Sequence, residues 1–310
     1  MSDFNLPFIS VIVPVFNDEK RIGKCIESLL NQTYPKDKFE VIIVDNNSYD
    51  KTIEIIKEYP VKLLRENKIQ SSYAARNLGV KSSRGDILVF TDSDCVADKN
   101  WLRGGINHIL KNNCDFLVGD VKFFYKNKNS VFEILDSFVH FNQEKSALNG
   151  RVATVNVFFK KNIFEKIGFF DQSVKSGADT IFSRTAIQKG FVCEFCSNAL
   201  VWHPARGFKE LVLKQKRVGY YSVYNMLSLE RSILYVVFRI FLDFLPQKKF
   251  FYRAIKNIDH DNKIILGIKL FFANWLMLSI ANFYRLVYLR DLIFKNISNE
   301  KNKRYNSSLQ

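Results

Sequence analysis

The first 204 residues of the 310-residue chain alternate between short apolar runs and longer segments with helical spacing. The apolar runs ISVIVPVF, FEVIIVD, VKLLRE and DILVFTD predict four buried strands. Between the first two, Ile22, Cys25, Ile26, Leu29 and Leu30 recur at intervals of three or four, which predicts a helix. Strands that alternate with helices predict an α/β fold whose mostly parallel, Rossmann-like sheet is covered by helices on both faces.

Residues that favour helix N-caps predict where the helices begin. Asn17 and Asp18 follow the first predicted strand, and either could cap the helix after it. Asp50 precedes a short segment rich in isoleucine, and Ser71 or Ser72 opens the segment SSYAARNLGVKSS. We therefore expect helices to start shortly after each of these residues.

Polar side chains lie where three of the predicted strands end. Asn17 follows the first strand, Asp45 ends the second, and Asp92 and Asp94 follow the fourth. Ligands of such sheets bind beyond the carboxyl ends of the strands, so these residues predict the binding site. The sequence has no Gly-x-Gly-x-x-Gly after the first strand and no Walker-type loop. This argues against a dinucleotide dehydrogenase and against a P-loop ATPase.

Asp92 and Asp94 stand one residue apart in VFTDSDC, at the end of the fourth predicted strand. Two carboxylates this close repel each other unless a cation lies between or beside them. Hard divalent cations such as Mg²⁺ and Mn²⁺ favour one or two carboxylates together with phosphate oxygens of a substrate. The pair therefore predicts a Mn²⁺ or Mg²⁺ site that stabilises a departing diphosphate during cleavage of a sugar–diphosphate bond.

The composition of the chain changes after Ala205. From there to the end, 19 Lys and Arg oppose 7 Asp and Glu, so this part carries +12 of the net charge of +15. Aromatic-rich helical stretches such as SILYVVFRIFLDFLP fill it. The longest run without charge is the 15 residues from Leu270 to Tyr284, whereas a spanning helix needs about 20. We predict a helical, basic extension over residues 221–310 that associates with an anionic membrane surface without crossing it. The alternative is a helical subdomain with a solvated basic face.

The cysteines and the N-terminus indicate the compartment. Five cysteines in a chain of this length predict no disulfide framework. Cys193 and Cys196 lie in FVCEFC, whose alternation predicts a strand with the two thiols on opposite faces. The opening MSDFNLPFISV lacks the basic-then-apolar pattern of a signal peptide. Together with the basic extension, this predicts a cytoplasmic protein that is peripheral on the inner face of the cell membrane.

The order of several segments resembles the family-2 glycosyltransferases of the GT-A fold over about residues 8–220. The matching segments are SVIVPVFND, LLNQTYP, FEVIIVDNNSYDKT, AARNLGV, RGDILVFTDSDC, VNVFFKKNIFEKIGFFD, GADTIFSRTAIQKGF and VWHPAR. The resemblance implies a GT-A domain over residues 1–220 and inverting transfer of a sugar from a nucleotide diphosphate donor such as a UDP-sugar. The acceptor it implies is a hydroxyl of a glycan or lipid-linked molecule in cell-surface polysaccharide or glycolipid assembly.

The resemblance also implies which residues bind the donor. Pro14 and Asn17 would shape the nucleotide pocket, Asp45 would accept the N3–H of uracil or pair with a related base, and Arg76 would lie near the base and diphosphate. The expected nucleotide-sugar-binding set is Pro14, Phe16, Asn17, Asp45, Asn47, Arg76, Asp92 and Ser93.

For the metal, the resemblance implies that Asp94 binds the cation directly and that Asp92 holds ribose or a metal-bound water. His203, in WHP after a strand, matches a further metal or phosphate ligand of the family. A lone histidine after a strand can also be purely structural, and that alternative stays open for His203.

Asp179, in SGADTIFSRTAIQKGF, matches the position of the general base that would deprotonate the acceptor hydroxyl. The alternative is that Asp179 only caps the helix that starts there. The chain departs from the family pattern at this point, because family members often carry Glu-Asp where this chain has Ala178-Asp179. It also has Gln70 and Ser71 where the family commonly has a glycine.

Two other functions are compatible with parts of the sequence. The basic extension could bind nucleic acid, but its aromatic residues interleave with Leu and Ile at helical spacing, which suits anionic lipids better, so we expect no nucleic-acid partner. A nucleotide-binding α/β domain that binds membranes or nucleic acid without transferase activity is a related alternative. A sugar-1-phosphate nucleotidylyltransferase would open with a glycine-rich basic loop, and PVFNDEKRIG is not such a loop.

Overall fold

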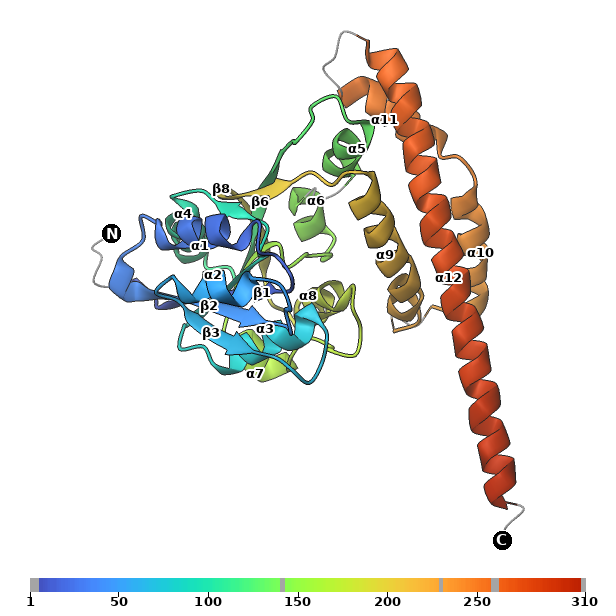
Figure 1. Ribbon diagram of the computed structural model, residues 1–310, viewed down its shortest axis with the longest axis horizontal. Helices are drawn as coiled ribbons and strands as arrows, with labels where there is room; N and C mark the ends of the chain where they lie inside the picture. Colours follow the sequence, from blue (N-terminus) through green and yellow to red (C-terminus); the bar gives the residue numbers. More distant parts are fainter. Residues whose placement is uncertain (1–5, 140–142, 229–230, 258–261, 308–310) are drawn as a thin grey trace. The chain divides into compact units, whose positions relative to one another are not determined.

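The computed structural model of the chain describes residues 6–139, 143–228, 231–257 and 262–307. These residues form two compact units (Figure 1). The first unit comprises Met1–Lys126 and Val139–Ala205, and the second comprises Asn127–Phe138 and Arg206–Gln310. The change of composition after Ala205 therefore falls at the end of the first unit, and residue 220 lies within helix α9 (Phe208–Ser228).

The first unit is built on one eight-stranded sheet with the order β3-β2-β1-β4-β7-β6-β8-β5. Its strands are β1 (Ile9–Val15), β2 (Phe39–Asp45), β3 (Lys62–Arg65), β4 (Ile87–Thr91), β5 (Val96–Ala97), β6 (Phe116–Phe124), β7 (Asn156–Lys160) and β8 (Cys193–Pro204). The four predicted strands are parallel neighbours, and β6 and β8 are also parallel. Among the strands of the described residues, β7 and β5 are the two that pair with their neighbours in the antiparallel direction. The predicted α/β class with a mostly parallel sheet is confirmed.

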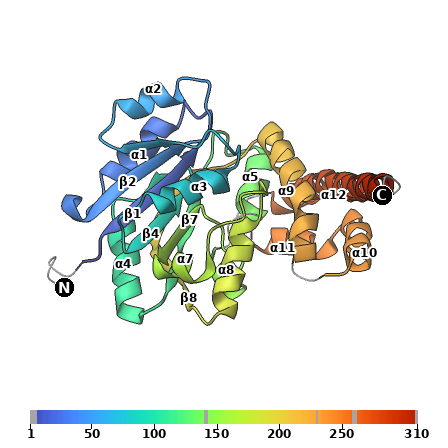
Figure 2. The same ribbon diagram turned by 90° about the horizontal axis from the view of Figure 1, so that it is seen from below.

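Helices cover both faces of this sheet, as the two ribbon views show (Figures 1 and 2). Cys25 of α1, Ile56 of α2 and Trp101 of α4 share one apolar core with the sheet. On the opposite face, the ring of Phe164 from α7 packs against Phe90 of β4 and against Phe182 of α8. The helices of this unit are α1 (Ile22–Leu30), α2 (Thr52–Lys57), α3 (Ser72–Lys81), α4 (Trp101–Asn112), α6 (Gln143–Leu148), α7 (Asn162–Ile167) and α8 (Ala178–Gln188), with a short 3₁₀ turn at Lys36–Lys38.

The helix starts agree with one of the three predicted caps. Ser71 is the N-cap of α3 and accepts a hydrogen bond from the Tyr73 amide. The N-cap of α2 is Lys51 and not the predicted Asp50, although the Asp50 carboxylate accepts a hydrogen bond from the Thr52 amide. The prediction for α1 was wrong, because Arg21 is its N-cap. The Asp18 side chain is instead bound to Arg21 and Ser93, so it joins two loops and does not cap the helix.

The second unit consists of helices, as predicted for the basic extension. They are residues 131–138 of α5 (Val131–Val139), α9 (Phe208–Ser228), α10 (Ile233–Phe244), α11 (Lys248–Asn257) and α12 (Lys263–Ser307). Leu211 of α9, Phe250 of α11 and Leu270 of α12 share one apolar cluster, while Val223, Ile240 and Leu289 share another. Helices α9 and α12 touch through their backbones, because a Cβ on Gly219 would lie 2.3 Å from the Ala281 carbonyl oxygen.

The length of α12 bears on the prediction that the extension does not cross a membrane. Over Lys263–Phe294 the helix is long and apolar enough, by length and composition alone, to cross one, and an 18-residue window within it has a mean hydropathy of 1.9 and is 39% buried. A buried helix of a folded unit can meet the same criterion, so the prediction is not decided by this length. Arg285 of this helix is paired inside the unit, with its Nη1 2.7 Å from the Asp243 carboxylate.

Candidate active site

The predicted site residues lie together at one edge of the sheet because β2, β1 and β4 are parallel neighbours. Asn17, Asp45 and Asp92 therefore follow or end three adjacent strands on the same side. Pro14, by contrast, is buried within β1, where it pairs in register with Val44. Pro14 can shape the pocket only through the strand that it belongs to.

Two loops at this edge are joined by reciprocal hydrogen bonds. The Asn17 amide donates to Ser48 Oγ at 2.9 Å, and the Tyr49 amide donates to Asn17 Oδ1 at 2.9 Å. Asn17 and Asn47 both have positive φ, at 48° and 73°, a conformation that asparagine tolerates better than most residues. The phenylalanine and tyrosine rings of Phe16 and Tyr49 meet edge to face at 6.0 Å and are exposed. An exposed aromatic pair on cross-linked loops gives a planar base a surface to stack on.

Asp45 is more enclosed than its predicted contact with a base suggests. The residue is 1% exposed, and its carboxylate accepts hydrogen bonds from the Asn47 amide at 3.2 Å and the Ser48 amide at 3.3 Å. These bonds hold the loop after β2 in its left-handed turn. The carboxylate therefore has a structural role in this loop. Its remaining lone pairs could accept a hydrogen bond from an N–H of a nucleotide base.

Arg76 of α3 binds Asp92 at the end of β4, with Nη2 2.6 Å from the carboxylate Oδ1. Arg76 is 5% exposed, and its Nε has no hydrogen-bond partner among the described residues. A buried guanidinium N–H without a partner is costly unless a ligand accepts from it. This orphaned donor beside the aspartate pair fits an anionic ligand such as a diphosphate.

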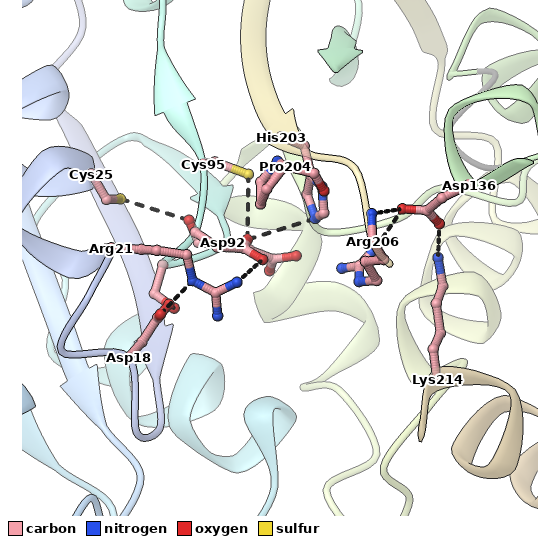
Figure 3. A network of polar contacts seen from close by, with 12 residues as sticks. Asp18, Arg21, Cys25, Asp92, Cys95, Asp136, His203, Pro204, Arg206 and Lys214 are labelled. Atoms are coloured by element: carbon pink, nitrogen blue, oxygen red, sulfur yellow. Dashed lines mark hydrogen bonds and ion pairs between the residues drawn. The ribbon is translucent and has the colours of Figure 1, made fainter. Parts of the chain in front are cut away.

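The best candidate for a metal site is the group formed by Asp94, Cys95 and His203, whose ligand atoms all lie within 4.8 Å of one another. His203 is fully buried, and its Nε2 lies 3.6 Å from Asp94 Oδ1. Its Nδ1 lies 2.6 Å from the Pro204 carbonyl oxygen, which can only accept, so Nδ1 carries the proton (Figure 3). With Nδ1 as the donor to Pro204, Nε2 is the ring nitrogen that could bind a cation, and it faces a carboxylate oxygen of Asp94.

Two acceptors that face each other at 3.6 Å fit a shared cation, since each ligand lies about 2.1 Å from Mg²⁺. The Nδ1–H bond to a backbone carbonyl is also the outer contact that orients a metal-binding histidine. Cys95 fits less well, because burial and the Asp94 carboxylate raise the pKa of its thiol, and hard cations prefer oxygen. We therefore assign Asp94 and His203 as the residues that could hold the metal.

Arg21 was missed by the sequence analysis. Its Nε lies 2.5 Å from Asp18 Oδ1, and its Nη1 lies 3.6 Å from Asp94 Oδ2 (Figure 3). The Asp18 carboxylate also accepts a bond from Ser93 Oγ at 2.6 Å. Burial raises the pKa of Asp18, and these bonds and the Arg21 charge oppose that rise. The spacing of Asp18 and Arg21 in the sequence was the one available signal, and such i, i+3 pairs are common on helices.

Asp179 is the second residue of α8, whose N-cap is Gly177. The alternative that Asp179 is the N-cap is therefore wrong. Its Oδ1 accepts bonds from the Tyr73 hydroxyl and the Thr180 amide, each at 3.0 Å. Its Oδ2 accepts bonds from Thr154, from the amide at 3.1 Å and from Oγ1 at 3.3 Å. The half-buried carboxylate is thus held by Tyr73 of α3, by Thr180 of its own helix and by Thr154, two residues before β7. The sequence analysis had identified neither Tyr73 nor Thr154.

Comparison with known proteins indicates what such a site does. The model of the family described as glycosyl transferase family 2 matches residues 10–189. Glycosyltransferase AglE of Haloferax volcanii is 38% identical over 252 residues, which cover 78% of this chain and 83% of that protein. A Methanococcus voltae protein is 30% identical over 202 residues, or 59% of this chain and 63% of its own length. It is named dolichyl N-acetyl-alpha-D-glucosaminyl phosphate 3-beta-D-2,3-diacetamido-2,3-dideoxy-beta-D-glucuronosyltransferase.

Among solved structures, the mannosyltransferase PcManGT of Pyrobaculum calidifontis, in complex with GDP-Man and Mn²⁺, has a similar fold. It aligns with a TM-score of 0.55 at 16% identity, over 98% of this chain and 84% of that chain. At this identity the likeness shows the fold alone. It confirms the GT-A fold for the α/β unit described above.

Proposed function

The chain belongs to glycosyl transferase family 2 and is a glycosyltransferase, and on this premise we propose that it is metal-dependent and inverting. In this proposal it moves a sugar from a nucleotide diphosphate donor, such as a UDP-sugar, to a hydroxyl of a glycan or lipid-linked acceptor in cell-surface assembly. The observation that carries the proposal is the facing pair of acceptor atoms, Asp94 Oδ1 and His203 Nε2, 3.6 Å apart. They lie at the sheet edge where Arg76 binds Asp92.

The donor nucleotide is proposed to bind across the ends of β1, β2 and β4. Its base would stack near Phe16 and hydrogen-bond at the loop that Asp45 and Asn47 form. Its diphosphate would accept a hydrogen bond from Nε of Arg76, the buried donor without a partner. Asp92 and Ser93 would then contact the ribose end of the donor or water near the metal.

Asp94 and His203 are the residues proposed to hold Mn²⁺ or Mg²⁺. When bound, the cation would neutralise charge that develops on the departing diphosphate. The chain's own contribution is to keep the two acceptor atoms apart and aligned: the Pro204 carbonyl oxygen fixes the tautomer of His203, and Arg21 restrains the second oxygen of Asp94. PcManGT, whose structure contains Mn²⁺, has a similar fold, which supports a divalent cation here.

Asp179 is the proposed general base. Removal of the acceptor hydroxyl proton requires a carboxylate that is ionised and fixed in direction. The bonds that Thr154 and Tyr73 donate fix the direction of the Asp179 carboxylate and leave it little rotational freedom. Ala178 is small and buried, so the missing glutamate of the family's Glu-Asp pair leaves Asp179 in place at the start of α8.

The proposed acceptor class and location rest on the relatives and on the second unit. The Methanococcus voltae relative is named for a dolichyl phosphate-linked sugar, which supports a lipid-linked acceptor for this chain. The basic, apolar helices of residues 206–307 support a position on the inner face of the cell membrane, peripheral and in contact with anionic lipid.

The proposal is tested by titrating a panel of UDP-, GDP- and CDP-sugars into the full chain with and without Mn²⁺. One donor should bind at least about tenfold more tightly in the presence of Mn²⁺ because the metal bridges protein and diphosphate. Turnover with that donor should release a nucleoside diphosphate and invert the configuration of the anomeric carbon, as followed by NMR. Release of pyrophosphate would instead indicate a nucleotidylyltransferase. If Mn²⁺ changes the affinity for none of the donors, Asp94 and His203 do not form a metal site.

A further inference from the structure

Helix α10 has an apolar face that no described part of the chain covers. Leu234, Phe238, Phe241 and Leu245 recur at intervals of three or four, and they are 78%, 59%, 68% and 61% exposed. The opposite face of the helix is in place, because Val236 and Ile240 are buried in the core of the second unit. The helix is therefore packed on the second unit through one face, and its other face exposes the apolar stripe. Two phenylalanines and two leucines in a row are an unusual surface for a helix in water.

Helix α12 presents a second stripe of the same kind. Its inward positions, such as Leu270, Ala273 and Met277, are buried in the unit. Its outward apolar side chains are Ile265, Ile268, Phe272, Trp275, Leu276, Phe283 and Leu286, each 39–58% exposed. From Ile265 to Leu286 the stripe runs for about 30 Å, at a rise of about 1.5 Å per residue.

The two stripes adjoin. The indole N–H of Trp275 donates to the Phe244 carbonyl oxygen at 2.8 Å, at the end of α10. Val236 and Ile240 of α10 share a cluster with Leu289 of α12, so the two helices run in opposite directions. One apolar surface therefore covers both helices, with Trp275 at their junction.

Positive charge flanks this surface. Helix α11, which connects α10 and α12 in the sequence, exposes Lys248, Lys249, Arg253 and Lys256 around Tyr252, and its ten residues include no Asp or Glu. Lys269 is exposed beside the α12 stripe. An apolar face bordered by cations matches the acyl chains and headgroups of an anionic bilayer, and it does not match a second copy of the same basic surface.

The inner face of α12 shows why this helix should not cross the bilayer. Leu211, Gly219 and Val223 of α9 lie along α12 from Leu270 to Leu289. Between these contacts α9 carries Lys214, Lys216 and Arg217. If α12 spanned the membrane while packed on α9, these cations would be drawn into the hydrocarbon core, where charges are strongly disfavoured.

We propose that α10 and α12 form a platform that lies flat in the interfacial layer of an anionic membrane, with Trp275 inserted and α9 on the side away from the lipid. This inference deepens the membrane association proposed above, and it depends only on contacts within the second unit. An experiment can therefore refute the membrane platform without refuting the transferase activity, and an experiment on the activity can fail without refuting the platform.

Binding of the full chain to vesicles tests the surface. The chain should float with vesicles of phosphatidylcholine and phosphatidylglycerol, and the double variant Phe238→Ser/Phe241→Ser should lose roughly tenfold in partitioning because binding scales with buried apolar area. Leu148→Ser removes an equally exposed apolar side chain, 84% exposed, from the first unit and should change nothing. If wild type ignores these vesicles, or is a dimer that the double variant converts to a monomer, the platform is not a lipid surface.

Depth measurements test the orientation. A bimane label is placed at Ile265→Cys or at Leu286→Cys in a Cys193→Ser background, since the other four cysteines are buried. Trp275 fluorescence is read in the full chain with Trp202→Phe, because Trp101 is buried. Lipids brominated near the headgroup should quench all three sites strongly, and lipids brominated near the end of the acyl chain should quench all three weakly. Deep quenching at Trp275 with shallow quenching at both ends would show a spanning helix and overturn the proposal.

Discussion

The hydroxyl of Tyr73 donates a hydrogen bond to Oδ1 of Asp179 at 3.0 Å and accepts one from the Gly177 amide at 3.0 Å. Burial, and then the Asp179 charge, raise the pKa of Tyr73, so the phenol keeps its proton and remains a donor. The ring also lies under the Arg76 guanidinium, 5.6 Å from its centroid. Tyr73 thereby contacts both Asp179, the proposed general base, and Arg76, the arginine that binds Asp92.

Tyr73→Phe should lower kcat by about tenfold, part of the 10²–10⁴ that a positioned base contributes, and leave the KM for the donor unchanged. Without the bond from Tyr73, Oδ1 of Asp179 keeps only the bond from the Thr180 amide, so the carboxylate should be less well oriented for proton transfer. Tyr34→Phe is the matched control, because the buried Tyr34 hydroxyl donates to the Pro7 carbonyl oxygen. If Tyr73→Phe keeps the wild-type kcat, or loses no more of it than Tyr34→Phe does, Tyr73 is only a packing residue.

Asp179→Asn should reduce kcat by roughly 10²–10⁴ while donor affinity persists. The amide oxygen can still accept bonds from Thr154 or Tyr73, so the melting temperature should change little. Steady-state kinetics, titration of the donor and thermal unfolding separate these effects. Turnover at the wild-type rate would place the base elsewhere.

Asp94→Asn should abolish turnover and weaken Mn²⁺ binding, since an amide cannot replace an anionic ligand. His203→Gln should weaken Mn²⁺ binding at least about tenfold, the scale seen when a metal histidine loses its support. Titration calorimetry with Mn²⁺ and the donor measures both. His108→Asn is the control, because His108 binds Glu194 on the first unit's surface and has no part in the proposed site. Unchanged Mn²⁺ affinity in both site variants would refute the metal site.

The position of the site was predictable because it depends on local patterns. Continuous apolar runs defined β1, β2 and β4, and parallel neighbours necessarily bring Asn17, Asp45 and Asp92 to one edge. Ser71 was predictable as a cap for the same reason, because its bond to Tyr73 spans two residues.

The supporting contacts were not predictable, because they join segments far apart in sequence without a period. Tyr73 and Asp179 are 106 residues apart, and Asn17 and Tyr49 are 32 apart. The antiparallel strand β7, inserted beside β4, likewise follows from tertiary pairing alone. The pairing of Arg285 was also not predictable: in the sequence it interrupts an apolar run, whereas in the structure it is paired with Asp243, 42 residues away.

Gly219→Ala should destabilise the second unit by about 1–3 kcal/mol, because the new methyl group would collide with the Ala281 backbone. The cost falls on the contact between α9 and α12, so hydrogen exchange should rise in both helices. Gly207→Ala is the control, since a Cβ there meets no atom within 4 Å. Equal stability of the two variants, measured by urea unfolding, would contradict the close packing of α9 on α12.

The buried ion cluster of the second unit leads to a prediction about pH. The Asp136 carboxylate is fully buried and lies 3.4 Å from Lys214 Nζ and 3.6 Å from Arg206 Nη1, and its Oδ2 accepts the Arg206 amide at 2.9 Å (Figure 3). Burial, and then the Arg206 charge, lower the pKa of Lys214 from 10.5 to about 7, although Asp136 opposes this shift. The folded chain therefore releases the Lys214 proton at a lower pH than the unfolded chain does.

Between about pH 7 and 10.5 the unfolded state binds more protons at Lys214, so the free energy of unfolding should rise with pH across this range. The contribution is at most about 1.4 kcal/mol per pH unit, since the unfolded state holds at most one extra proton there. Urea unfolding at pH 7, 8 and 9 should show the rise in wild type, and Lys214→Met should remove it. The variant keeps Asp136 paired with Arg206, so the fold should survive. If Lys214→Met retains the full wild-type slope, the rise belongs to another group, and Lys214 stays charged in the folded unit.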